Sequence, residues 1–196
     1  MSLVDAATKA ELTALYQAPD RHYHGVRHIE ALLSLLGEHR QAFADPDAVE
    51  AAIWFHDAIY DSRRKDNEAA SAALAADRLR GHVDAPRLAR IVKMIEATAA
   101  HQIPEFEDGT ARQDAALFLD MDLSILGAPA EAFEAYEAAV RREYGWVSYE
   151  DWRAGRAAVL KSFLARPRIF HTDIFAERFD TQARENMSRS LARLSS

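Results

Sequence analysis

Apolar residues recur at helical spacing along the whole chain, and this pattern restricts the fold more than any other feature of the sequence. In the segment 21–40 they follow one another at intervals typical of one face of a helix, at Ile29, Leu32, Leu33 and Leu36. Alanine, leucine and charged residues dominate, and glycine and proline are sparse. No segment alternates with a period of two for long. The sequence therefore predicts an all-α protein.

Capping signals divide this pattern into successive helices. Asp45 followed by Pro46 indicates the N-cap and first turn of the helix that carries His56, and Asp84 and Ser148 are N-cap candidates for two later helices. No repeats, low-complexity tracts or linkers separate the helices, so we expect a single domain. The other expected helices include 2–16, 67–81, 84–101, 129–144, 148–166 and 181–194.

The composition narrows the class of function. A net charge of −7, from 24 basic and 31 acidic residues, argues against a nucleic-acid polymer or an anionic membrane as partner, although a few local arginines can still hold a small anion. The chain has no cysteine, so a metal site must use His, Asp and Glu. No apolar run approaches the roughly 20 residues of a membrane span and no signal peptide is recognisable, so we expect a cytoplasmic protein.

A histidine and an aspartate stand side by side within the apolar run 51–60. If this run is helical, Ile53, His56 and Tyr60 share one stripe, so His56 faces the core and Asp57 lies at the edge of the stripe. Burying such groups is costly unless they gain a partner, which is either another protein group or a metal ion. For the dipeptide alone, a hydrogen-bonded core histidine beside a helix-capping or surface aspartate is the commoner explanation.

Polar residues also interrupt the apolar stripes of two other expected helices. His24 and His28 are four residues apart near the start of one helix, and Asp122 follows Phe118 by four residues in another. Each has a structural alternative: a solvated helix end for the histidines, and a cap or an arginine partner for Asp122. Together with His56 and Asp57, however, they offer imidazoles and carboxylates from separate helices. Such a set can hold one divalent ion with positions open for water.

A series of short motifs covers nearly the whole chain after residue 20. On these motifs the chain resembles the HD-domain metal-dependent phosphohydrolases, in particular small stand-alone bacterial members described as predicted phosphohydrolases. The resemblance implies one HD-type helical domain over 1–196, with a metal-site core at about 20–127 and C-terminal helices at about 129–196. The motifs are YHGVRHI (23–29), FHDAIY (55–60), DNEAAS (66–71), Thr98 with His101, LFLDMDLSILG (117–127), REY (142–144), GRAAVLKSFLARPRIFHT (155–172) and AREN (183–186).

The resemblance implies that four residues, His24, His56, Asp57 and Asp122, bind one divalent metal ion. His24 is preferred to His28 because the family's first ligand is a histidine followed three residues later by arginine. Asp122 is preferred to Asp120 because the family uses the second aspartate of a D-x-D pair. Mn, Co, Ni, Fe, Mg and Zn are all compatible with such ligands.

Two-metal members of the family usually carry a histidine near the glutamate of the helix that follows the HD motif. Here Asp66 and Asn67 occupy that place. This departure argues against a two-metal site, and with it against the dinuclear-iron oxygenases that share the fold.

The implied activity is hydrolysis of a small phosphorylated metabolite, most simply a nucleotide, by a metal-activated water. Asp57 is expected to orient the water, Glu68 to act as a base or an orienting group, and His28 and His101 to donate hydrogen bonds to the phosphate. Arginine and lysine side chains bind phosphate well. The candidates for substrate binding are Arg156, Lys161, Arg166 and Arg168.

Each of these roles has a structural alternative. Glu68 is also a favourable first-turn residue, His28 and His101 can be core or helix-end histidines, and exposed arginines are usually only solvated. The whole site has two alternatives as well: a non-catalytic module that binds a metal and a nucleotide, and an oxygenase with two irons. No feature of the sequence sets the class of phosphoester or the oligomeric state.

Overall fold

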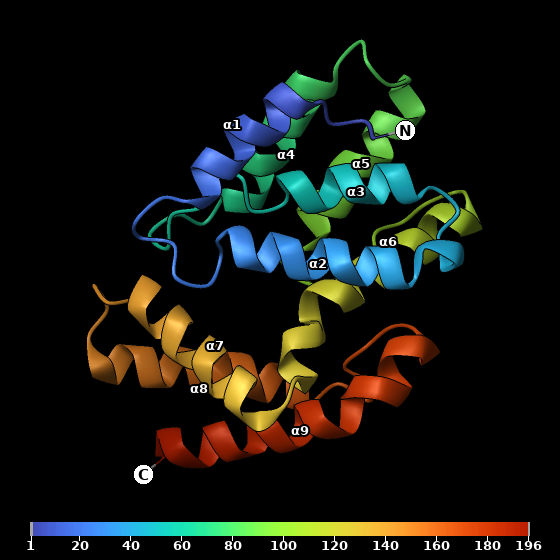
Figure 1. Cartoon of the computed structure of the whole chain (residues 1–196). Helices are drawn as coiled ribbons and strands as arrows, with labels where there is room; N and C mark the ends of the chain where they lie inside the picture. Colours follow the sequence, from blue (N-terminus) through green and yellow to red (C-terminus); the bar gives the residue numbers. More distant parts are fainter. Residues whose placement is uncertain (1, 196) are drawn as a thin grey trace. The chain divides into compact units, whose positions relative to one another are not determined.

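The structure, a computed structural model, describes residues 2–195. Within this range it contains nine α-helices, two 3₁₀ helices and no strand beyond an isolated bridge between Arg80 and Val83, which confirms the all-α prediction (Figure 1). No described helix combines the length and the apolar character needed to cross a bilayer. The elements are α1 (Ala6–Tyr16), α2 (Val26–Glu38), η1 (Arg40–Ala42), α3 (Pro46–Phe55), α4 (Asn67–Leu79), α5 (Ala85–Ala97), α6 (Gly109–Leu123), η2 (Ser124–Gly127), α7 (Ala130–Glu143), α8 (Tyr149–Leu164) and α9 (Asp173–Ser195).

The contacts between residues divide the chain into two compact units. The first unit is Met1–Asp122 and contains α1 to α5 and nearly all of α6, while the second unit is Leu123–Ser196 and contains η2 and α7 to α9. The sequence placed the change between the metal-site core and the C-terminal helices a few residues later, at about residue 128. A single domain over the whole chain stays a prediction.

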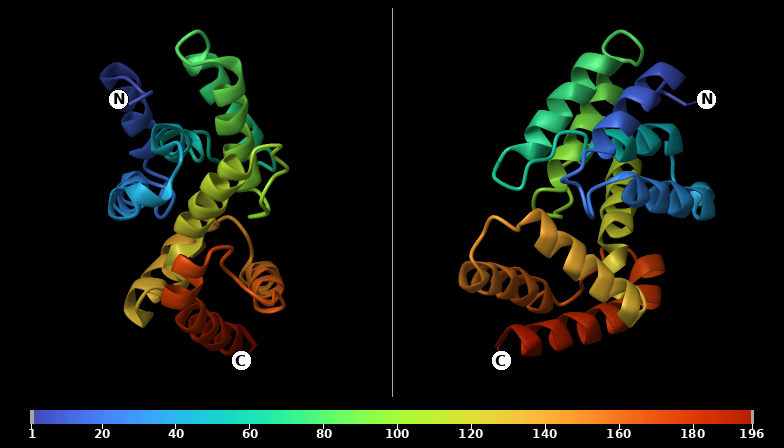
Figure 2. Two further views of the ribbon diagram at one scale, coloured as in Figure 1. Left: turned by 90° about the vertical axis from the view of Figure 1, so that its right-hand side faces the viewer. Right: turned by 60° about the vertical axis from the view of Figure 1, so that its left-hand side comes forward.

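Helix α3 is the centre of the first unit. It packs against α1, α2, α4 and α5, and α4 and α5 run side by side along their length (Figure 2). The side chains of Val49, Ile53 and Phe55 are completely buried, and so are those of Ala51 and Ala52 on other sides of the helix. A helix with apolar residues on several sides must be covered on those sides, and the two alanines let its neighbours approach closely. Its C-terminal end therefore lies inside the core.

Both ends of α3 are fixed by side chains. At the N-terminus, Asp45 accepts a hydrogen bond from the Ala48 amide at 3.1 Å and Pro46 opens the first turn, as the sequence predicts. At the C-terminus the helix stops at Phe55, so the expectation that the 51–60 run is one helix through Tyr60 is wrong. His56 is the C-cap, with φ −57° and ψ −36°, and Asp57 lies in the turn that follows.

In the second unit, α7, α8 and α9 and the short helix η2 pack around a core that includes Phe133, Leu160 and Met187 (Figure 2). Helix α9 begins at Asp173, eight residues before the predicted start at 181. The first turn of α9 contributes Phe175 to the core, where its ring is completely buried, while the neighbouring Ile174 is exposed. The spacing of apolar residues alone therefore placed the start of this helix too late.

Candidate metal centre

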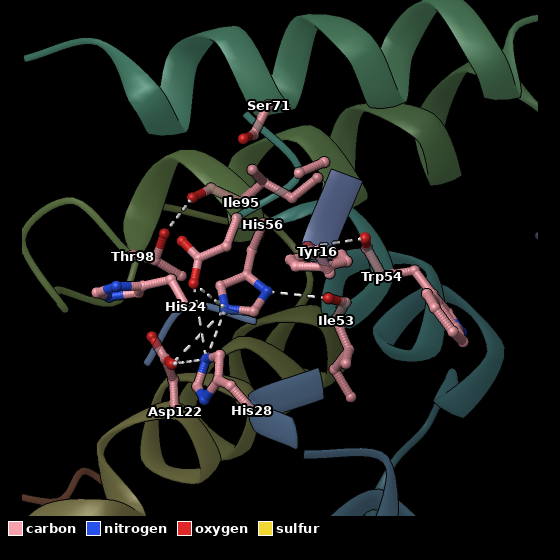
Figure 3. A network of polar contacts seen from close by, with 12 residues as sticks. Tyr16, His24, His28, Ile53, Trp54, His56, Ser71, Ile95, Thr98 and Asp122 are labelled. Atoms are coloured by element: carbon pink, nitrogen blue, oxygen red, sulfur yellow. Dashed lines mark hydrogen bonds and ion pairs between the residues drawn. The ribbon is translucent and has the colours of Figure 1, made fainter. Parts of the chain in front are cut away.

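Three helices of the first unit bring polar side chains to one buried point. His28 lies in the first turn of α2, His56 caps the C-terminus of α3, and Asp122 lies in the last turn of α6. The rings of His28 and His56 and the carboxylate of Asp122 point toward one another (Figure 3). Each residue offers one ligand atom, and these three atoms lie within 4.8 Å of one another.

The separations within this group suit a bound cation. The Nε2 atoms of His28 and His56 are 3.1 Å apart, and Oδ1 of Asp122 is 3.1 Å from Nε2 of His28 and 3.7 Å from Nε2 of His56. Ligand atoms that each lie about 2.1 Å from one ion are roughly 3–4 Å from one another. The three donors therefore already stand at coordination spacing. A cation held by His28, His56 and Asp122 fits these side chains.

Asp57 adds a second carboxylate to the cluster. Its Oδ2 lies 3.2 Å from Nε2 of His56 and 3.7 Å from Nε2 of His28. The side chains of Asp57 and Asp122 are 14% and 13% exposed, whereas those of His56 and His28 are 1% and 5% exposed. Solvent thus reaches the cluster from the carboxylate side, while the imidazoles close its inner side.

The ligand atoms that lie close together belong to His28, His56 and Asp122, whereas the sequence favoured His24 over His28 as the first ligand. Helix α2 begins at Val26, so His24 lies in the bend before the helix and not on its inward stripe. Its ring stacks on Tyr60 with the centroids 4.1 Å apart. His28, four positions later, supplies the imidazole that faces His56 and Asp122. His28 is therefore the first ligand of the candidate set, and metal binding by His24 stays a prediction.

A backbone carbonyl fixes the tautomer of His56. Its Nδ1 is 2.9 Å from the carbonyl oxygen of Ile53, and a carbonyl only accepts, so Nδ1 carries the hydrogen. In the neutral ring the lone pair is then on Nε2, the nitrogen that faces Asp57 and Asp122. An outer hydrogen bond of this kind is typical of histidines that bind metal ions.

Even without a metal ion, the carboxylates of the cluster favour positive charge at its centre. Burial favours the neutral form of His56, but the carboxylates of Asp57 and Asp122 outweigh it and raise the pKa of His56 to about 9. Burial also favours the neutral carboxyl groups, yet the neighbouring imidazoles hold the pKa of Asp57 and the pKa of Asp122 well below their usual range. Two ionised carboxylates thus face a protonated imidazole, and a metal ion can replace that proton.

His101 contacts the cluster from the turn after α5, because this helix ends at Ala97 and not at the predicted residue 101. Its Nε2 is 2.9 Å from Oδ2 of Asp122, the carboxylate oxygen that the other imidazoles leave open. His101 has a φ of 50°, the left-handed region that non-glycine residues rarely adopt. His101 thus contacts the candidate ligand Asp122. A role in binding phosphate stays a prediction.

Glu68 lies in the first turn of α4, and none of the hydrogen bonds or ion pairs of residues 2–195 connects it with the cluster. Its predicted role as a base stays a prediction. Its neighbours have a clearer function: the Asn67 side chain accepts from the Asp61 amide at 3.0 Å and donates to the Asp61 carbonyl at 2.9 Å. One turn later, Ser71 accepts from the Ile59 amide at 3.0 Å. The DNEAAS motif therefore fixes the loop that follows the His-Asp pair.

Tyr16 is a contributor that the sequence analysis missed. It is 2% exposed, and its hydroxyl donates to the carbonyl oxygen of Trp54 at 3.0 Å. Burial, together with the charge of Asp57, raises the pKa of Tyr16 well above its usual value, so the hydroxyl stays protonated and remains a donor. The only signal in the sequence was a tyrosine on the apolar face of α1.

The four predicted substrate-binding cations all belong to the second unit. The guanidinium of Arg156 is buried and binds Glu137 and the hydroxyl of Tyr136, the latter at 2.9 Å, so it serves an internal ion pair. Arg168 pairs with Asp173 at 2.8 Å, Arg166 lies over the ring of Phe163, and Lys161 lies in the last turn of α8. Substrate binding by Arg156, Lys161, Arg166 and Arg168 stays a prediction.

Comparison of the chain with protein-family models, with curated proteins and with solved structures found no match.

Proposed function

We propose that the chain binds one divalent metal ion through His28, His56 and Asp122, with Asp57 as a further ligand, and hydrolyses a small phosphorylated metabolite. One observation carries this proposal: three ligand atoms from three helices lie within 4.8 Å of one another at a buried point. The fixed tautomer of His56 and the ionised carboxylates support it. The family resemblance of the sequence supplies the reaction class and favours a nucleotide as substrate.

When bound, the ion supplies Lewis acidity, which polarises a phosphoryl oxygen and lowers the pKa of water at the site. The protein residues divide the remaining work. The carboxylate of Asp57 lies on the solvent side, where it can accept a hydrogen bond from the attacking water and orient it. We assign His101, whose side chain is 21% exposed and contacts Asp122, the role of donating a hydrogen bond to an incoming phosphoryl oxygen. The buried imidazoles exclude bulk water from the inner side.

The test has two parts. First, protein purified without chelators is analysed for metal, and we expect one divalent ion per chain. Second, the Mn- and Co-loaded protein is assayed against phosphomonoesters, phosphodiesters and nucleoside triphosphates. Asp122→Asn should abolish both metal retention and turnover, whereas Asp66→Asn, at a carboxylate that is 63% exposed, should change neither.

The outcomes separate the alternatives. Metal retention without turnover of any phosphoester would favour the non-catalytic binding module. Two irons per chain would favour the oxygenase. Failure to retain any divalent ion, with the fold intact by circular dichroism, would remove the basis of the proposal.

A further inference from the structure

The turn after α3 contains backbone carbonyl groups that need donors. The last carbonyls of a helix have no partner within the helix, and inside a core water cannot replace one. Two of them are satisfied locally: the Ile53 carbonyl by His56 Nδ1 and the Trp54 carbonyl by the Tyr16 hydroxyl. The carbonyls of Asp57 and Ala58 lie beyond these, next to the candidate metal ligands.

Arg21 supplies the donors for both. Its Nη1 donates to the Asp57 carbonyl at 2.5 Å and to the His24 carbonyl at 3.1 Å, and its Nη2 donates to the Ala58 carbonyl at 2.8 Å. A planar guanidinium, with five donors in a fixed fork, can serve three acceptors at once. One side chain thus ties the bend before α2 to the turn after α3.

Two aromatic rings hold this guanidinium in place. Its central carbon lies 5.1 Å from the ring centroid of Tyr16 and 5.7 Å from that of Tyr60, within the range of cation–π attraction. The same Tyr60 ring stacks on His24. Arg21 is therefore fixed by its surroundings before any ion or substrate binds.

The hydrogen bonds of Arg21 go to the carbonyl of Asp57 and leave its carboxylate facing the imidazoles. A shift of the backbone of this turn would move this carboxylate away from His56, from which it is now 3.2 Å. Arg21 opposes that shift because it binds the carbonyls of two successive residues of the turn, Asp57 and Ala58. Its positive charge also favours the carboxyl end of a helix.

We propose that Arg21 is a positioning residue of the metal site: it holds the turn after α3 so that Asp57 and His56 face the same ion. This inference depends on the metal binding proposed above. Outer contacts that orient ligands typically contribute about 10- to 100-fold to metal affinity. We therefore expect removal of the guanidinium to weaken Co(II) binding by about tenfold or more and to change the visible spectrum of the bound cobalt.

The experiment compares four full-length proteins: wild type, Arg21→Met, Arg21→Lys and Arg87→Met. Arg87 is the matched control, because it binds the other end of the same helix, where its Nε and Nη2 lie 2.7 and 2.5 Å from the carboxylate of Asp45. Each protein is titrated with Co(II) against a competing chelator, its visible absorption spectrum is recorded, and its stability to urea is measured. Both methionine variants should lose stability.

Only the Arg21 variants should lose cobalt affinity and change the spectrum. Arg21→Lys, which keeps the charge but lacks the fork, should recover part of the affinity and is the variant to use if Arg21→Met does not fold. Wild-type affinity and spectrum in both Arg21 variants would overturn the inference. An equal loss in Arg87→Met would overturn it too, since the effect would then follow from stability alone. Absence of cobalt binding by the wild type would instead refute the proposed function itself.

Discussion

His101 contacts Asp122 from a strained backbone: its Nε2 lies 2.9 Å from Oδ2 of Asp122, and its φ is 50°. A non-glycine residue in this region costs about 1 kcal/mol or more. The chain accepts this cost at a residue that touches a candidate ligand, which suggests that the contact is selected for its effect on the site.

Two substitutions separate the contact from the strain. His101→Ala removes the imidazole and keeps the unfavourable φ, whereas His101→Gly removes both. We expect both variants to bind Co(II) about tenfold or more weakly, because Asp122 loses its outer partner. His101→Gly should be the more stable of the two by about 1 kcal/mol in urea unfolding. Wild-type cobalt affinity in both variants would show that His101 does not orient Asp122.

The choice between His28 and His24 gives a second prediction. His28→Gln should abolish retention of a divalent ion, because the side chain that faces His56 and Asp122 loses its ring nitrogen. His24→Gln should keep the ion, because the ring of His24 stacks on Tyr60. Metal content after gel filtration measures both. The opposite result would restore the ligand set implied by the family resemblance.

The sequence was informative where the cause of a feature is local. The caps at Asp45, Asp84 and Ser148 were predicted correctly, because each side chain bonds an amide only three residues away, at 3.1, 2.9 and 3.1 Å. His56 and Asp122 were found because a polar residue on an apolar stripe is visible in the spacing alone. These features needed no knowledge of the partner helix.

The sequence was misleading where a helix end depends on distant residues. The end of α3 is held by residues more than thirty positions earlier. Tyr16 binds the carbonyl of Trp54 in its last turn, and Arg21 binds the carbonyls of Asp57 and Ala58 beyond it. The choice between His24 and His28 likewise depends on where α2 begins. It begins at Val26, only two residues after His24. Periodicity fixes the face of a helix much better than it fixes its ends.

A third prediction concerns the close approach of η2 and α9 in the second unit. A Cβ added at Gly127 would lie 2.6 Å from both Cβ and the carbonyl oxygen of Phe179, too close for either to remain in place. The Asn186 side chain holds the two segments together by donating to the carbonyls of Leu126 and Ala128, each at 2.8 Å. Gly127→Ala should therefore destabilise the protein by about 1–3 kcal/mol.

Gly155 provides the matched control for this substitution. It lies within α8, and an added Cβ would meet nothing within 4 Å. Gly155→Ala should stabilise the protein by about 0.5–1 kcal/mol, because alanine favours the helix. Thermal unfolding of both variants gives the comparison. Equal effects of the two substitutions would mean that the contact between Gly127 and Phe179 is not as tight as described.

The fourth prediction is a pH dependence of stability in the metal-free protein. The pKa of His56 rises from 6.5 to about 9 on folding, so its contribution is complete below pH 6.5 and is lost as the pH rises through about 9. The pKa values of Asp57 and Asp122 fall below 3.8, so their contributions are complete above pH 3.8 and are lost as the pH falls. The cluster should therefore stabilise the metal-free protein most between pH 3.8 and 6.5. Urea midpoints measured from below pH 3.8 to above pH 9 test this, with His56→Ala as the control that lacks the alkaline loss.

Above pH 6.5 the affinity for a metal ion should rise with pH, whereas the contribution of His56 to the stability of the metal-free protein falls. A metal ion can coordinate Nε2 of His56 only after the proton has left, so each bound ion releases that proton at neutral pH. The apparent affinity should then rise by about tenfold per pH unit until the pKa of His56 is reached. Isothermal titration of Mn(II) in buffers of different ionisation enthalpy counts the released protons. An affinity that stays constant between about pH 6 and pH 8 would mean that His56 is already neutral, or that it does not bind the ion.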